Sequence, residues 1–332
     1  MKRIAVIGGG SWGTALAIHL CSIRHSVTIW VYERDLAQRI ESKRDNDLYL
    51  PGFHIPASVK PTSSLERALD GAEILISAIP SHFCRQVLTQ IIPFLQEDMI
   101  IVSATKGIEN QSLMRMSQII TSLLKERFQP QLAVLSGPSF AVDVARHHPT
   151  AVVIASRDIE LARMIQREFY SSYFRLYTST DLIGVELAGS FKNVIAIAAG
   201  VINGLGYGFN TVAALITRAL AEMSRLVIAM GGKERTMYGL AGIGDLVLTC
   251  SGDLSRNRRV GQRLGKGERL DDILKGMTMI AEGIKTTKSV MDISRKLNIE
   301  MPITNQVYDI LYKDKEPQQA VRELMLRELK SE

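Results

Sequence analysis

Residues 3–17 read RIAVIGGGSWGTALA, and this stretch decides the fold. It places the pattern G-x-G-x-x-G, carried by Gly8, Gly10 and Gly13, between an apolar β-branched run and a stretch with helical spacing. Gly8 permits a tight turn, Gly10 lets the backbone approach a pyrophosphate, and Gly13 lets the helix pack closely on the strand. Unpaired backbone N–H groups at such a helix start, together with the helix dipole, favour anions. The stretch predicts a dinucleotide-binding turn; the alternative is a glycine-rich turn without a ligand.

The first half of the chain alternates strand-like and helix-like segments. The expected strands are continuously apolar, as in a parallel sheet whose two faces are both covered by helices. They are Arg3–Ile7, Val27–Val31, Glu73–Ile79, Met99–Ala104, Leu132–Leu135 and Ala151–Ala155. This alternation predicts an α/β fold with a doubly wound parallel sheet of the Rossmann type.

The second half of the chain carries helical patterns only. We expect Asn210 to cap a helix that has Arg218 and Glu222 on its polar face. A flexible turn is expected at Gly200, Gly204, Gly206 and Gly208. Further helices are expected at Ile284–Leu297, Thr304–Tyr312 and Pro317–Leu329. The sequence therefore predicts two domains, a dinucleotide-binding Rossmann domain over residues 1–185 and an all-helical substrate-binding domain over residues 186–332.

The composition of the 332 residues limits the classes of protein. Hydrophobic residues make up 46% and charged residues 22% of the chain, which is typical of a globular protein. The net charge of +6 favours anionic small ligands at least as readily as nucleic acid. Cys21, Cys84 and Cys250 lie far apart, so the sequence indicates no zinc site and no disulfide framework, and a cytoplasmic location fits best. Glycines or charges interrupt every long apolar stretch, so we expect no membrane insertion.

The end of the second expected strand bears on the choice between NAD and NADP. A site selective for NAD usually has Asp or Glu at this end of the strand. Here no acidic residue occupies the expected position near Trp30, and Glu33 lies beyond it, beside Arg34. The 2′-phosphate of NADP is therefore not obviously rejected. Arg34 either attracts that phosphate or merely starts a solvated helix.

Polar residues follow two expected strands at the edge of the sheet where ligands bind. Lys106 comes after the strand Met99–Ala104, and Gly137 and Ser139 come after Leu132–Leu135. Lys106 is either a ligand-binding residue or an ordinary solvated lysine.

Two charged residues lie in very apolar surroundings. Lys192 falls inside the segment Val185–Ala199, where a lysine is unfavourable unless it is paired, functional, or extended to the surface. Desolvation would lower its pKa toward the range that suits a proton donor and acceptor. Asp245 is either the partner of a lysine or a substrate hydroxyl, or a helix N-cap.

The densest basic cluster is Ser255-Arg256-Asn257-Arg258-Arg259. Ser255 can cap a helix whose first turn holds Arg256 and Asn257. Cations at this place oppose the helix dipole, which is tolerable if an anion binds there. The alternatives are a solvated basic face and a nucleic-acid patch; because no aromatic residues interleave, we expect no nucleic-acid partner.

Taken together and in order, these motifs resemble the bacterial NAD(P)-dependent glycerol-3-phosphate dehydrogenases over nearly the whole chain. The resemblance is carried by KG at 106–107, SGPSFA at 136–141, KNV at 192–194, GLGYGFN at 204–210, GLAGIGDL at 239–246 and SRNR at 255–258. Ser139 stands where threonine is common, and Tyr32 stands where histidine or arginine is frequent. The segment Pro51–Pro61 matches less well.

The resemblance implies a reversible hydride transfer between NAD(P)H and dihydroxyacetone phosphate, giving sn-glycerol 3-phosphate for glycerophospholipid synthesis. It places the active site between the two domains and makes Lys192 the catalytic acid/base, with Asp245 orienting either that lysine or the substrate hydroxyl. The implied substrate-binding residues are Lys106, Gly137, Ser139, Asp245, Ser255, Arg256 and Asn257. The implied cofactor-binding residues are Ser11, Trp12, Tyr32, Lys106, Ala141, Arg256, Ile280 and Glu282. The glycine motif adds Gly8, Gly10 and Gly13 to this set, and the residues after the second expected strand add Arg34. No metal is implied.

Two other functions share parts of this pattern. A β-hydroxyacid dehydrogenase of the 6-phosphogluconate type carries lysine and asparagine several positions apart, whereas Lys192 and Asn193 are adjacent here. A non-catalytic Rossmann redox sensor would not explain why Lys106, Lys192, Asp245 and Arg256 all match an active site. The sequence leaves open the preference for NAD or NADP, a homodimer, and feedback regulation.

Overall fold

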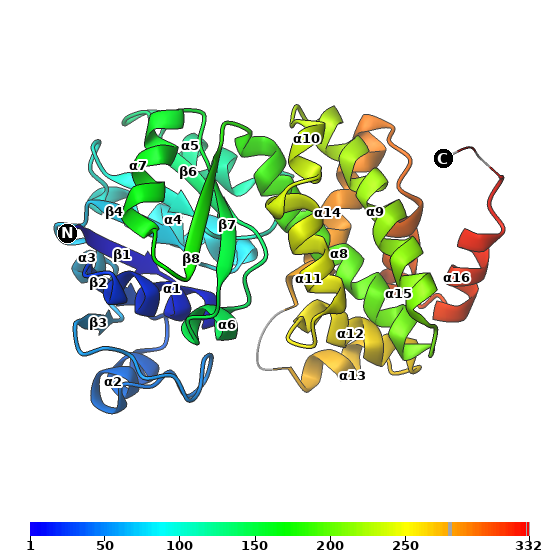
Figure 1. Ribbon diagram of the computed structural model, residues 1–332, viewed down its shortest axis with the longest axis horizontal. Helices are drawn as coiled ribbons and strands as arrows, with labels where there is room; N and C mark the ends of the chain where they lie inside the picture. Colours follow the sequence, from blue (N-terminus) through cyan, green and yellow to red (C-terminus); the bar gives the residue numbers. More distant parts are fainter. Residues whose placement is uncertain (278–280, 330, 332) are drawn as a thin grey trace. The chain divides into compact units, whose positions relative to one another are not determined.

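The chain forms two compact units in a computed structural model that describes residues 1–277, 281–329 and 331 (Figure 1). Unit 1 comprises Met1–Lys106 and Met114–Glu186, and unit 2 comprises Gly107–Leu113 and Leu187–Glu332. The short segment after Lys106 thus belongs to the second unit. The division into folding domains at residue 185 stays a prediction.

Among the described residues, unit 1 contains an eight-stranded sheet in the order β3-β2-β1-β4-β5-β6-β7-β8. The strands are β1 (Arg3–Ile7), β2 (Ser26–Trp30), β3 (Val59–Thr62), β4 (Ile74–Ser77), β5 (Ile100–Ser103), β6 (Gln131–Ser136), β7 (Thr150–Ala155) and β8 (Phe174–Ser179). Neighbouring strands from β3 to β6 pair parallel, while β7 pairs antiparallel with β6 and parallel with β8. The Rossmann-type sheet is confirmed, and its strand order reverses at β1, the kind of place where open α/β sheets bind ligands.

Helices cover both faces of this sheet. They are α1 (Ser11–Ser22), α2 (Arg34–Lys43), α3 (Leu65–Leu69), α4 (Ser81–Ile91), α5 (Met116–Leu124), α6 (Ala141–Ala145) and α7 (Ile159–Phe169). Side chains alternate along β1. Ile4 and Val6 join one buried core with α1, α2 and α7, while Ala5 and Ile7 join another with α3, α4 and α5. The strand is therefore apolar on both faces, as its sequence predicts.

Two strands of the sheet, β3 and β8, were not expected from the sequence. Both lie at an edge of the sheet. β3 reads VKPT and contains Pro61, which cannot donate to a strand ladder and is tolerated at an edge. β8 reads FRLYTS, with Phe174 and Leu176 buried and Arg175 and Tyr177 exposed. A search for continuously apolar runs misses such half-buried strands.

Unit 2 is helical wherever the structure describes it in regular elements. Its helices are α8 (Leu182–Gly204, which begins in unit 1), α9 (Phe209–Ala229), α10 (Glu234–Met237), α11 (Asp245–Ser251), α12 (Arg256–Gly265), α13 (Leu270–Lys275), α14 (Glu282–Leu297), α15 (Pro302–Tyr312) and α16 (Pro317–Met325). By length and composition α8 could cross a membrane, but its apolar window is entirely buried in the protein. This burial is typical of the core helix of a soluble protein.

Helices α8 and α12 touch through their backbones. A Cβ atom at Gly200 would lie 2.0 Å from the carbonyl oxygen of Arg258, and one at Gly261 would lie 2.0 Å from that of Ile197. Gly200 and Gly204 therefore lie inside α8, at a close contact between helices, and their assignment to a flexible turn was wrong. Lys192 lies on α8 and Arg256 lies on α12. The contact between the two helices therefore fixes the positions of the Cα atoms of these residues relative to each other.

The first turn and the polar face of α9 also differ from the prediction. Gly208, and not Asn210, is the N-cap of α9. Glu222 is fully buried, where a place on a polar face was expected; it accepts hydrogen bonds from the backbone N–H groups of Ile303 and Thr304, each at 2.9 Å. Burial raises the pKa of Glu222, although these donors oppose the shift. Its carboxyl group thus caps the start of α15 from another helix.

Candidate active site

The glycine-rich turn between β1 and α1 has the shape that the motif predicts. Gly8 has a φ of +125°, and a Cβ there would lie 2.6 Å from the carbonyl oxygen of Ala78. A Cβ at Gly13 would lie 1.9 Å from the carbonyl oxygen of Gly8. Among the described residues, no heavy atom lies within 4 Å of a Cβ built at Gly10. Glycine is therefore required at two positions by the protein itself, and the open space at the third fits a pyrophosphate.

The other predicted cofactor residues of this region lie close by in the chain. Ser11 is the first residue of α1, and its hydroxyl donates to the carbonyl oxygen of Tyr49 at 2.5 Å. Tyr32 is 79% exposed, and Arg34 is the first residue of α2 and is exposed. Glu33 accepts a hydrogen bond from the phenol of Tyr49 at 2.6 Å. Arg34 thus starts a solvated helix, and its attraction for a 2′-phosphate stays a prediction.

Three predicted substrate residues meet at the carboxyl ends of β5 and β6. The carbonyl oxygen of Gly137 accepts from Lys106 Nζ at 3.3 Å and from the hydroxyl of Ser139 at 3.0 Å. Gly137 has a φ of +144°, and a Cβ there would lie 2.9 Å from the Cα of Val152. Ala141 follows as the first residue of α6. The side chain of Lys106 is thus held at the sheet edge where ligands of such folds bind.

Lys192 is buried in α8 and does not extend to the surface. Its side-chain ammonium pairs with Asp245 Oδ1 and donates to Thr249 Oγ1 at 2.9 Å. Lys192 is 7% exposed and Asp245 is 0% exposed. Gly244 precedes α11 as its N-cap, and Asp245 is the first helical residue. The interpretation of Asp245 as a lysine partner is confirmed, and its interpretation as an N-cap is wrong.

A glycine-rich segment comes directly before α11 and Asp245. Residues Leu240–Gly244 form a π-helical turn, a form that is frequent at functional sites. Inside it, a Cβ at Gly242 would lie 2.2 Å from the carbonyl oxygen of Met237. Thr249 lies one turn after Asp245 and donates to its carbonyl oxygen at 2.6 Å. Thr249 was missed from the sequence, although its i, i+4 spacing from Asp245 was a usable signal.

The start of α12 is capped as predicted. The hydroxyl of Ser255 accepts from the backbone N–H of Arg258 at 3.2 Å. Arg258 forms an ion pair with Asp253, whereas within the described residues Arg256 has no hydrogen-bond or ion-pair partner. Burial lowers the pKa of Arg256, and the nearby Glu282 acts in the opposite direction. A half-buried cation at a helix start is poorly explained as part of a solvated face and suits an anion site.

Asn257 connects α12 to the start of α14. Its Oδ1 accepts from the backbone N–H of Gly283 at 2.9 Å. A Cβ at Gly283 would lie 2.5 Å from the carbonyl oxygen of Asn193, the residue after Lys192. The first turn of α14, which includes Glu282, therefore packs against the residues beside both Lys192 and Arg256. Ile280 lies outside the described residues.

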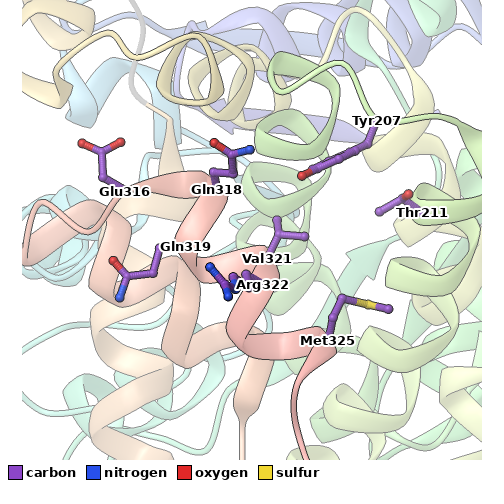
Figure 2. A pocket seen from close by; sticks show the side chains of 8 residues that line it. All are labelled: Tyr207, Thr211, Glu316, Gln318, Gln319, Val321, Arg322 and Met325. Atoms are coloured by element: carbon purple, nitrogen blue, oxygen red, sulfur yellow. The ribbon is translucent and has the colours of Figure 1, made fainter.

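Other features of the described chain do not add to this site. No group of three or more His, Cys, Asp or Glu side chains is placed to hold a metal in the described residues. A pocket of about 910 Å³ opens between the start of α9 and α16, lined by Tyr207, Thr211, Arg322 and Met325 among others (Figure 2). None of the predicted site residues that the structure describes lines this pocket.

Comparison with known proteins decides the family. The model described as NAD-dependent glycerol-3-phosphate dehydrogenase N-terminus matches residues 3–162, and the corresponding C-terminus model matches residues 181–322. The chain belongs to the NAD-dependent glycerol-3-phosphate dehydrogenase family. This dehydrogenase therefore uses NAD(H) or NADP(H), as the sequence predicts, and neither alternative function is favoured.

Individual relatives of the dehydrogenase agree. A glycerol-3-phosphate dehydrogenase (NAD(P)+) of Koribacter versatilis is 54% identical over 329 residues, which are 98% of each chain. One from Syntrophotalea carbinolica is 51% identical over 330 residues, 99% of each chain. A crystal structure of glycerol-3-phosphate dehydrogenase from Coxiella burnetii superposes with a TM-score of 0.94 at 40% identity, covering 98% of this chain and 99% of that one.

Proposed function

We propose that this dehydrogenase interconverts dihydroxyacetone phosphate and sn-glycerol 3-phosphate with Lys192 as its acid/base. The observation that carries the proposal is the buried contact of Lys192 with Asp245 and Thr249 inside an otherwise apolar helix. A buried ion pair adds little to stability compared with apolar residues of the same size. Such a pair is therefore better explained by chemistry than by folding.

A bound reduced nicotinamide would supply the hydride for the C2 carbonyl carbon of the substrate. Lys192 Nζ, as an ammonium, donates the proton that the C2 oxygen then requires, and the ketone becomes a secondary alcohol. Asp245 favours the charged ammonium before the transfer and, with Thr249 Oγ1, fixes the direction of Nζ. In the reverse reaction the neutral amine of Lys192 takes the proton from the C2 hydroxyl.

The substrate phosphate is proposed to bind at the start of α12. Arg256 can offer two parallel N–H donors to a phosphate, and Ser255 leaves backbone N–H groups of the first turn directed the same way. Asn257 Oδ1 is committed to Gly283, so its amide nitrogen is the end that can donate to a phosphate. Lys106, beside Gly137 and Ser139, is proposed to contact the substrate from the sheet edge of unit 1.

The activity is tested with purified enzyme and each reduced cofactor. Addition of dihydroxyacetone phosphate should remove the absorbance of NADH or NADPH and yield an equal amount of sn-glycerol 3-phosphate. The Lys192→Ala variant should bind the cofactor without consuming it. If the unaltered enzyme bound the cofactor but consumed neither NADH nor NADPH with this substrate, a non-catalytic sensor would be the better interpretation.

We propose further that the product supplies glycerophospholipid synthesis and that the enzyme acts in the cytoplasm as a homodimer. Phe209, Met325 and Leu326 are 94%, 78% and 73% exposed, and large exposed apolar side chains are typical of association surfaces. Light scattering on the full chain should give twice the monomer mass of 36.8 kDa. A mass of one chain at working concentration would contradict the homodimer.

A further inference from the structure

The segment between α2 and β3 folds back onto the glycine-rich turn. Within this segment, Asn46 makes the contact with the turn, and 0% of the surface of Asn46 is exposed. Its Nδ2 donates to the carbonyl oxygen of Gly9 and to the hydroxyl of Thr14, both at 2.8 Å. Its Oδ1 accepts from the backbone N–H of Tyr49 at 3.1 Å. Both amide hydrogens and the amide oxygen are therefore engaged.

The contact with Gly9 engages a carbonyl oxygen of the glycine-rich turn. Backbone N–H groups attract a pyrophosphate, while a carbonyl oxygen directed toward it would repel it. Asn46 holds the Gly9 carbonyl, and the hydroxyl of Thr14 also approaches that oxygen, at 3.4 Å. With glycine at positions 8, 9 and 10, the turn has many backbone conformations to lose when a ligand orders it.

Tyr49 adds two links to the same region. Its carbonyl oxygen accepts from Ser11 at 2.5 Å, and its phenol donates to Glu33 at 2.6 Å. The hydroxyl of Ser11 is thus directed to the protein, and the natural contribution of Ser11 to a cofactor is its backbone N–H at the start of α1. Asn46 and Tyr49 together join the glycine turn to the N-cap residue of α2.

We propose that Asn46 is a positioning residue for the cofactor, which holds the Gly8–Gly13 turn in its pyrophosphate-binding form before the dinucleotide arrives. The proposal rests on the use of this turn by the dinucleotide, and not on the identity of the reduced substrate. Preorganisation of this kind raises affinity by removing the ordering cost from the binding step. Because both cofactors share the pyrophosphate, Asn46 should support NADH and NADPH equally.

Asn46→Asp tests the proposal. The carboxylate keeps an acceptor for the Tyr49 N–H but replaces the donor to Gly9 by an oxygen. The dissociation constants of NADH and NADPH, measured by calorimetry on the free enzyme, should each rise about tenfold, equivalent to about 1.4 kcal/mol. The KM for dihydroxyacetone phosphate at saturating cofactor should stay within about twofold. Unchanged dissociation constants, or a loss confined to one cofactor, would overturn the proposal.

Ser156→Ala is the matched control in the same unit. Ser156 directly follows β7, is buried, and its hydroxyl donates to the carbonyl oxygen of Leu132 in β6 at 2.8 Å, so both residues are distant in sequence from the turn. This variant should lower thermal stability and leave both dissociation constants unchanged. If Asn46→Asp does not fold, Thr14→Val removes the hydroxyl that Asn46 holds and should raise both constants severalfold; no rise would also refute the proposal. Failure of the unaltered enzyme to reduce the substrate would refute the proposed function alone.

Discussion

Two helices of this enzyme begin where a phosphate is expected, and they are built differently. α1 begins after Gly10, within a turn of glycines whose backbone N–H groups can face an anion. α12 begins after Ser255, whose hydroxyl caps it, and carries the half-buried cation Arg256 in its first turn. Backbone donors suit the pyrophosphate that both dinucleotides share. An arginine side chain suits a terminal phosphate, because its planar guanidinium can donate two parallel hydrogen bonds to a doubly charged group.

The difference also shows in what supports each helix start. The turn before α1 is held by Asn46 and by tight packing at Gly8 and Gly13. α12 is held by backbone contact with α8 and by the hydrogen bond from Gly283 to Asn257. An anion site made of backbone N–H groups depends on neighbouring side chains that fix the conformation of the turn. An anion site made of an arginine side chain depends on contacts that fix the position of its helix. Variants at the two starts should therefore fail in different ways.

The largest effect is expected at Lys192. Lys192→Ala should lower kcat by a factor of roughly 10²–10⁴, because general acid catalysis is lost. The dissociation constants of the cofactors should stay within about twofold, since neither helix start is altered. Stopped-flow turnover and calorimetry separate the two quantities. Near-full kcat in the variant would show that another group supplies the proton.

The next largest effect is expected at Gly10, where a change in cofactor binding can be separated from a change in folding stability. A methyl group at this position meets nothing in the described protein, so Gly10→Ala should leave the unfolding free energy unchanged within about 1 kcal/mol. It should nevertheless raise the dissociation constants of both cofactors by about tenfold or more, because the pyrophosphate needs that space.

Gly13→Ala provides the matched control for that prediction. Its Cβ would lie 1.9 Å from the carbonyl oxygen of Gly8, so this variant should lose folding stability as well as affinity. Urea unfolding with and without cofactor distinguishes the two variants. If Gly10→Ala bound the cofactors normally, the pyrophosphate would have to lie elsewhere.

The smallest effect concerns the choice of cofactor. We expect NADPH to serve at least as well as NADH, because Glu33 is bound to Tyr49 and the exposed Arg34 follows it. The ratio of kcat/KM for the two cofactors measures this directly. A preference for NADH of about tenfold, equivalent to about 1.4 kcal/mol, would contradict the expectation.

The sequence was sufficient where a residue's role depends on its neighbours in the chain. The strand, glycine turn and helix of residues 3–17 follow from local rules, and so does the Ser255 cap. Lys192 was recognisable because a charge in an apolar helix requires an explanation. The partnership with Asp245 joins residues 53 positions apart, and the sequence left it as one of two alternatives.

The sequence was insufficient where a role depends on distant partners or on an edge of the sheet. Asn46 contacts Gly9 across 37 positions, and Glu222 contacts Ile303 across 81, so neither role has a local signal. The close contact at Gly200 looks, in sequence, like any flexible glycine. β8 was missed because only one of its faces is buried.

The proposed substrate specificity depends on Arg256, at the start of α12, holding the substrate phosphate. The most direct test compares the unaltered enzyme and Arg256→Ala with two substrates, dihydroxyacetone phosphate and unphosphorylated dihydroxyacetone. A charge-assisted contact of roughly 1.5–3 kcal/mol predicts that kcat/KM for the phosphorylated substrate falls about 10- to 100-fold. For unphosphorylated dihydroxyacetone, kcat/KM should change little. The control variant is Arg259→Ala, because the side chain of Arg259 is exposed, and its kcat/KM should change little with both substrates. An equal loss with both substrates in Arg256→Ala would contradict the claim and assign the arginine to the cofactor or the fold.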